Sequence, residues 1–115
     1  MTVRSLAAAA LVVLASLVLS PVAAPASQAT TVTVTAKEFK FTLSTSSAKA
    51  GKVTFKVTNK GKIPHDFKIG STKTKMLGPG KSQTITATIK KGKNSYLCTV
   101  SGHAGLGMKG SFTGK

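Results

Sequence analysis

Apolar and polar residues alternate with a period of two along most of the chain after residue 30. In residues 52–59, Val53, Phe55 and Val57 share one face, while lysine and threonine occupy the other. Because successive side chains of a strand point to opposite faces, this alternation predicts half-buried β-strands. No segment after residue 30 has the 3.6-residue period of an amphipathic helix. The predicted strands are residues 31–36, 38–44, 52–59, 65–70, 83–90, 95–100 and 109–114.

Short turn sequences that contain glycine separate several of these segments. They are NKGK at 59–62, GPGK at 78–81 and KKGKN at 90–94. Glycine favours turns because it adopts positive φ angles at little cost. Short, regularly spaced strands joined by turns predict an all-β, antiparallel β-sandwich of seven to eight strands. Each sheet would bury one apolar face and expose a face of lysine and threonine.

The N-terminal segment has a different pattern. A positive start, MTVR, precedes a 14-residue apolar run at 6–19, and small residues and prolines follow. This order predicts a secretory signal peptide, since a membrane span needs about 20 apolar residues. Cleavage after Ala26 fits best and cleavage after Ala29 nearly as well; an uncleaved membrane anchor is the alternative. We therefore expect a leader at 1–26, one domain at 27–115, and a periplasmic, extracellular or envelope-associated protein.

The mature segment is strongly basic. Its 16 lysines face two acids, Glu38 and Asp66, which gives a net charge of +14. Scattered lysine is typical of a solvated surface that attracts anionic partners, and it would also allow contact with an anionic membrane surface. The absence of arginine after Arg4 argues against specific nucleic-acid binding, which relies on arginine for bidentate contacts.

Few side chains after residue 26 are good ligands for a transition metal. His65 begins a predicted strand, and Cys98, His103 and Met108 follow one another at five-residue intervals. Taken singly, each has an ordinary structural interpretation, such as a buried thiol or a methionine that fills the core. Loops at one end of a sandwich come together, however, so all four can converge. Two imidazoles, one thiolate and a weak axial thioether are the ligands of a mononuclear blue-copper site.

Three stretches carry a resemblance to a known family. IPHDF at 63–67, LGPGKSQTITATI at 77–89 and GKNSYLCTVSGHAGLGMKGSF at 92–112 resemble the cupredoxins, small blue copper proteins such as plastocyanin, azurin and auracyanin. The resemblance covers residues 37–115 and implies a Greek-key sandwich. It also implies one type 1 copper ion, bound by the imidazoles of His65 and His103, the thiolate of Cys98 and, weakly, by Met108.

Two positions depart from the family pattern. Asp66 follows the first histidine, where many relatives have asparagine; its backbone N–H would still be able to donate to the Cys98 sulfur. Leu97 precedes the cysteine, where some relatives have an aromatic residue. Tyr96 is expected in the core, with its hydroxyl finding a partner at the edge. Met76 lies outside the ligand pattern and is expected to pack within a turn.

The same residues argue against related copper centres and against zinc hydrolysis. A multicopper oxidase needs histidines beside the cysteine, and a binuclear copper centre needs a second cysteine; the chain has neither. A zinc hydrolase needs a general base near the metal, and Asp66 should point away from His65 because adjacent strand residues face opposite sides. No enzymatic activity is therefore expected.

The favoured function is one-electron transfer outside the cytoplasm by a copper ion that alternates between Cu(I) and Cu(II). The protein is expected to be a monomer that docks weakly on redox partners with acidic surfaces. Two alternatives stay open: a copper carrier or storage protein without a redox role, and a cationic binding module whose fold does not need the metal.

Overall fold

The computed structural model describes residues 2, 12–13, 15–16 and 30–115. The predicted leader and its cleavage sites fall outside these residues, apart from isolated positions. Within the described part of the chain, no helix is long and apolar enough to cross a membrane. The folded region begins at β1 and ends one residue before the C-terminus.

Within residues 30–115, nine strands form two sheets. One sheet has the order β2-β1-β4-β7, and the other has the order β3-β9-β8-β5-β6. The first contains β1 (Thr31–Lys37), β2 (Lys40–Leu43), β4 (Gly51–Asn59) and β7 (Ser82–Ile89). The second contains β3 (Ser47–Ala48), β5 (Lys68–Ile69), β6 (Thr72–Lys73), β8 (Gly92–Leu97) and β9 (Lys109–Gly114).

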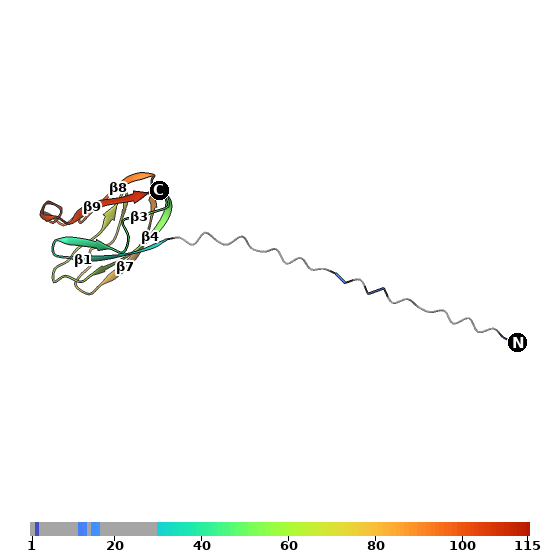
Figure 1. Ribbon diagram of the computed structural model, residues 1–115. Coiled ribbons are helices and arrows are strands. Elements are labelled where there is room, and N and C mark those ends of the chain that lie inside the picture. Colours follow the sequence, from blue (N-terminus) through green and yellow to red (C-terminus); the bar gives the residue numbers. More distant parts are fainter. Residues whose placement is uncertain (1, 3–11, 14, 17–29) are drawn as a thin grey trace.

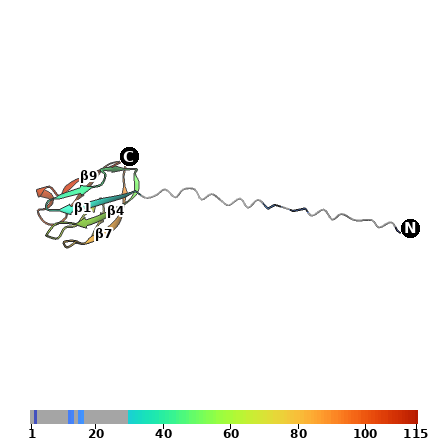
Figure 2. The same cartoon turned by 60° about the horizontal axis from the view of Figure 1, so that its bottom comes forward.

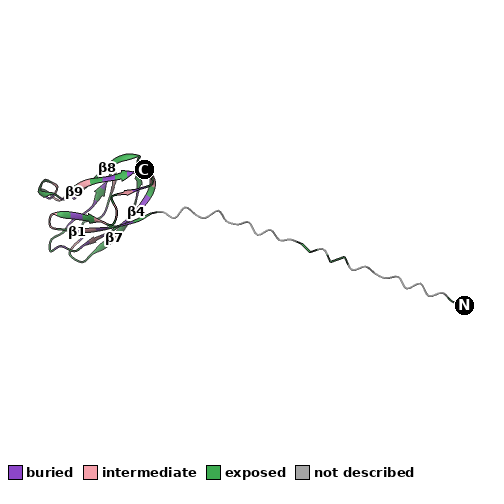
Figure 3. Ribbon diagram, viewed as in Figure 1, coloured by how far each residue is buried: buried purple, intermediate pink, exposed green. Residues whose placement is uncertain are grey.

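The two sheets lie face to face as two layers. Figure 1 shows β1, β4 and β7 in one layer and β3, β8 and β9 in the other, and Figure 2 shows the first layer from a second side. Buried and exposed residues alternate along the strands (Figure 3), so the apolar faces meet in a common core. The largest fully buried apolar side chains are Phe55, Phe67, Phe112, Ile69 and Met108.

The prediction of an all-β sandwich is confirmed, but its purely antiparallel pairing is wrong. β1 pairs with β4 in parallel, as does β3 with β9. After the β1–β2 hairpin the chain crosses to the other sheet as β3, so β4 returns beside β1 in the same direction. Apolar and polar residues alternate with the same period in parallel and antiparallel strands, so the sequence pattern does not distinguish the two pairings. The strand count of seven to eight is also too low, because β3 and β6 have only two residues each.

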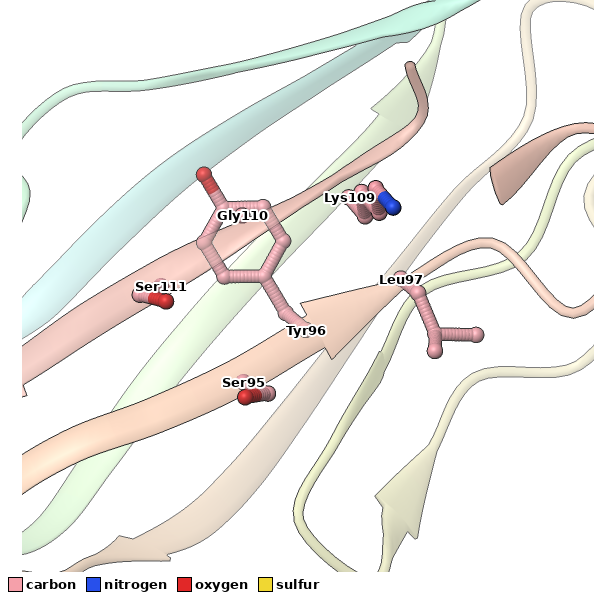
Figure 4. A pocket seen from close by; sticks show the side chains of 6 residues that line it. All are labelled: Ser95, Tyr96, Leu97, Lys109, Gly110 and Ser111. Atoms are coloured by element: carbon pink, nitrogen blue, oxygen red, sulfur yellow. The ribbon is translucent and has the colours of Figure 1, made fainter. Parts of the chain in front are cut away.

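The strand that leads to Cys98 is held against the core by Tyr96. Tyr96 pairs with Gly110 on β9, where a side chain would collide with the tyrosine ring. Figure 4 shows this ring beside Gly110 in a surface pocket that Ser95, Tyr96, Leu97, Lys109, Gly110 and Ser111 line. The ring centroid also lies 5.8 Å from that of Phe41 and 5.4 Å from that of Phe67. Tyr96 thus packs against the core but is only partly buried, whereas the sequence placed it inside the core.

Candidate metal centre

Four residues that the sequence singles out lie on loops between strands. His65 forms an isolated bridge with Leu77, rather than beginning a strand as predicted. Cys98 directly follows β8, and His103 precedes the short 3-10 helix η1 (Ala104–Leu106). Met108 precedes β9. Figures 1 and 2 show η1 at the end of the sandwich opposite the C-terminus.

The structure brings three of these side chains into one buried cluster. The Nδ1 atoms of His65 and His103 are 3.2 Å apart, and the Cys98 Sγ atom lies 4.0 Å from the first and 3.7 Å from the second. All three donor atoms lie within 4.8 Å of one another. His65 is 0% exposed, Cys98 1% and His103 9%. These three side chains form the candidate metal centre.

The spacing of the donor atoms fits a small transition-metal ion. An ion about 2.0–2.1 Å from two nitrogens and about 2.3 Å from a sulfur, in one plane, would separate the donors by roughly 3.5–3.8 Å. The observed separations, 3.2–4.0 Å, bracket that range. Two imidazoles with one thiol form a donor set that suits a transition-metal ion such as copper or zinc.

The loop from Cys98 to Met108 is closed by its own backbone. The Cys98 N–H donates to the Met108 carbonyl oxygen at 3.0 Å, and the Met108 N–H donates to the His103 carbonyl oxygen at 3.1 Å. Gly102 and Gly107 have φ angles of +82° and +120°, which other residues rarely adopt. The loop therefore places Met108 beside the candidate metal centre through its backbone, and the Met108 side chain is fully buried.

A buried asparagine, which the sequence interpretation missed, binds two segments next to His65: the loop that precedes it and the segment of its bridge partner Leu77. The Asn59 side-chain amide donates to the carbonyl oxygens of Ile63 and Leu77, both at 2.8 Å. Its Oδ1 accepts from the Gly61 N–H at 2.8 Å. The sequence indicated only that Asn59 begins a turn, since asparagine is common there.

Asp66 joins the His65 segment to the Cys98 segment. Its carboxylate is 2% exposed and accepts hydrogen bonds from the backbone N–H of Thr99, at 2.6 Å, and from the Thr99 hydroxyl. This bond connects the residue after the first histidine to the residue after the cysteine. The carboxylate thus binds Thr99 and not His65, which agrees with the prediction that it points away from that histidine.

The surroundings of Cys98 change the pKa of its thiol in opposite directions. Burial raises its pKa, whereas the backbone N–H groups of Asp66 and Val100 lower it in part. Because burial dominates, the thiol keeps its proton until a metal ion displaces it.

Glu38 is the second residue that the sequence interpretation missed. Its Oε1 accepts from His65 Nε2 at 2.9 Å, and from the backbone N–H groups of Lys62 at 2.8 Å and Ile63 at 3.2 Å. The bond to His65 is the main reason that the pKa of Glu38 falls from 4.5 to about 2. Strand patterning placed Glu38 in a strand with no special role. The only feature of the sequence that could have indicated a role for Glu38 is that acidic residues are rare: it is one of two in the chain.

The low pKa of Glu38 predicts acid sensitivity of the metal-free protein. A carboxyl whose pKa is lower in the folded state stabilises the fold above its unfolded pKa and loses that contribution as pH falls through the folded value. We expect the stability that Glu38 confers to decline between pH 4.5 and about 2. Urea unfolding of the wild type and of Glu38→Gln across this range should show curves that converge toward low pH. Curves that run parallel over the whole range would contradict the prediction.

Met76 is 53% exposed, so the expectation that it packs within a turn is wrong. Its neighbour Leu77 fills the core instead, because the bridge with His65 directs Leu77 inward.

The edge of the Phe39 ring meets the His103 ring, with centroids 5.1 Å apart, which packs the second histidine against the β1–β2 turn.

A family model described as "Cupredoxin-like domain" matches residues 7–110. A comparison with curated protein sequences gives no match. Solved structures of auracyanins and an azurin share the fold. Dithionite-reduced auracyanin from the photosynthetic bacterium Roseiflexus castenholzii is 24% identical, with a TM-score of 0.64 over 76% of this chain and 98% of that chain.

Two further structures are similar over nearly the same region. Auracyanin B is 23% identical, with a TM-score of 0.64 over 76% of this chain and 89% of that chain. An azurin from the obligate methylotroph Methylomonas sp. strain J is 16% identical, with a TM-score of 0.60 over 75% of this chain and 98% of that chain. At these identities the likeness establishes the shared fold.

Proposed function

Because the chain belongs to the family of cupredoxin-like domains, we propose that it is a type 1 blue copper protein that carries single electrons outside the cytoplasm. The observation that carries this proposal is the buried cluster of His65, Cys98 and His103, whose donor atoms lie within 4.8 Å of one another. These residues would hold one copper ion, with Met108 as the weak axial ligand. Bound copper supplies a centre that accepts and releases one electron.

The protein around the cluster keeps the donor atoms in place. Asn59 and Asp66 hold the His65 segment to its neighbours, and the backbone bonds of the 98–108 loop hold Cys98 and His103. Burial of the three donors excludes water from the ligand positions. A site that is already assembled needs little rearrangement when charge changes, and this favours electron transfer over release of the ion to another protein.

The role that we propose is not enzymatic. A hydrolytic site would need a general base free to act on a metal-bound water. Among the described residues the only two carboxylate side chains are Glu38, which binds His65, and Asp66, which binds Thr99. Neither is free to serve as such a base.

The surface at this end of the protein supports docking to redox partners. The exposed large apolar side chains of residues 30–115 are Ile63, Met76 and Leu106. Ile63 is two residues before His65, Met76 precedes its bridge partner Leu77, and Leu106 lies in η1 after His103. Exposed lysines, including Lys62 and Lys75, lie beside them. A small apolar surface edged by cations fits brief contact with proteins whose docking surfaces are acidic.

We also propose that residues 1–26 direct export and are then removed, with Ala29 as the alternative cleavage point. The charged, apolar and small-residue regions support this. The expected location is the periplasm, the extracellular space or the cell envelope, and the expected state is a monomer whose strong positive charge disfavours self-association.

The visible and EPR spectra of the copper-loaded protein test the proposed function. We expect an intense blue absorption in the Cu(II) state that disappears on one-electron reduction and returns on oxidation. Loading with Zn²⁺ is the control, because zinc has no redox chemistry and gives no such band. Stoichiometric copper binding without a blue band would contradict the electron-carrier role and favour a carrier or storage protein.

A further inference from the structure

Glu38 contacts the candidate metal centre from outside the ligand set. Its Oε1 lies 2.9 Å from His65 Nε2, on the side of the ring opposite the Nδ1 atom that faces Cys98 and His103. Building on the proposed function, we propose that Glu38 is a positioning residue of the copper centre. Its carboxylate holds the His65 ring with Nδ1 toward the metal, and its negative charge favours Cu(II) over Cu(I).

The carboxylate is itself fixed in place. Besides His65 it accepts from two successive backbone N–H groups, those of Lys62 and Ile63, at 2.8 and 3.2 Å. These residues belong to the loop that leads directly into His65. One oxygen thus joins the β1–β2 turn, the loop and the imidazole, and only 25% of the Glu38 side chain is exposed. A group held by several donors keeps its orientation better than a single flexible surface side chain would.

Gly61 supplies the space that this arrangement needs. A Cβ atom at position 61 would overlap the Glu38 Oε1 atom and lie 2.8 Å from the Glu38 carboxyl carbon. Gly61 is buried and does not have a positive φ angle, so a Cβ atom there would have to push the carboxylate aside but would not strain the backbone. The chain therefore accommodates the carboxylate against its backbone, which is independent support for a defined role of Glu38.

The hydrogen bond determines which ring nitrogen of His65 is free. An ionised carboxylate accepts hydrogen bonds only, so His65 Nε2 must carry the proton, and the lone pair of the neutral ring then lies on Nδ1. That is the nitrogen 4.0 Å from the Cys98 sulfur and 3.2 Å from the His103 Nδ1. Carboxylates bound to metal-ligating histidines set the tautomer and raise the basicity of the ligand.

The charge distribution gives Glu38 a further effect. The chain has two acids against 17 lysines and arginines, and both acids lie at the candidate metal centre. A negative charge close to a metal ion stabilises its more positive oxidation state. Glu38 should therefore lower the reduction potential of a centre that is otherwise surrounded by a cationic protein.

Three variants serve the first measurement. Glu38→Gln removes the charge but keeps an acceptor, and Gly61→Ala displaces the carboxylate without changing the net charge. Ser71→Lys, in the exposed turn between β5 and β6 at the end of β5 remote from His65, is the matched control because it changes net charge by the same amount as Glu38→Gln.

Voltammetry of the copper-loaded proteins gives the first measurement. For Glu38→Gln we expect the ratio of Cu(II) to Cu(I) affinity to fall about tenfold, which corresponds to a potential about 59 mV higher for a one-electron couple. Gly61→Ala should shift the potential in the same direction, and Ser71→Lys should stay close to the wild type. A potential in Glu38→Gln that equals that of Ser71→Lys would overturn the electrostatic role.

Nitrogen NMR of the His65 ring in the metal-free protein at constant neutral pH gives a second measurement, one that needs no copper. The wild type should show the Nε2–H tautomer alone, whereas Glu38→Ala and Gly61→Ala should populate both tautomers. An unchanged tautomer in both variants would overturn the positioning role. Failure of the proposed function is distinguishable, because it would appear as a wild-type protein that binds copper without a blue band. In that case the electrostatic role falls with it, and the tautomer result still decides the positioning role.

Discussion

Replacement of Cys98 by serine is expected to abolish the blue absorption and to weaken copper binding by more than about 100-fold. That exceeds the upper range observed when only an outer partner of a metal ligand is lost. The physical reason is that the thiolate proposed as a ligand is soft and strongly donating, and a hydroxyl does not replace it at neutral pH. The measurements are the visible spectrum and the Cu(I) and Cu(II) dissociation constants from chelator competition.

Met76→Ala is a suitable control for this experiment. Met76 also carries sulfur and lies next to Leu77, the bridge partner of His65, but it is 53% exposed and outside the predicted ligand set. Its spectrum and copper affinity should match those of the wild type. A blue Cys98→Ser protein would contradict the assignment of Cys98, and a colourless Met76→Ala protein would show that the ligand set has been misidentified.

Truncation of Phe67 to alanine is expected to cost the fold about 3–5 kcal/mol of unfolding free energy, which is typical of a large cavity in a core. Phe67 is fully buried, and its ring packs against Phe41 and Phe55 from one sheet and Tyr96 from the other, with centroids 5.2–5.6 Å apart. Urea unfolding of the metal-free protein, followed by far-UV circular dichroism, measures the loss.

Leu106→Ala is the matched control, since it also removes a large apolar side chain. Leu106 is 63% exposed, so its truncation should change the unfolding free energy by no more than about 0.5 kcal/mol. Equal losses for the two variants would mean that Phe67 does not join the two sheets as the structure indicates.

The alternation of residues predicted the sandwich because burial of one face imposes a period of two on every long strand. Val53, Phe55 and Val57 are 0% exposed, as their phase required. The pattern did not reveal pairing direction, since parallel and antiparallel strands alternate alike. It also missed β3 and β6, because two residues cannot display a period.

The residues of the candidate metal centre were predictable because side chains that bind transition metals are rare in this sequence. Cys98 is the only cysteine, and His65 and His103 are the only histidines, so few alternative ligand sets existed. The partners of these ligands were not predictable in the same way. Glu38 is 27 residues from His65, and their contact depends on how the β1–β2 turn lies over the loop at 60–63. Such a contact follows from tertiary packing, which local patterning does not describe.

The commitment of both acids to the candidate metal centre has a consequence for encounters between copies of this protein. With Glu38 and Asp66 engaged internally, no carboxylate side chain elsewhere in the chain offsets the lysines. Two copies that approach through their apolar ends bring like charges together and repel, most strongly at low ionic strength. In the proposed role as an electron carrier, this repulsion would slow self-exchange between identical molecules. It would thereby direct electrons toward partners of opposite charge.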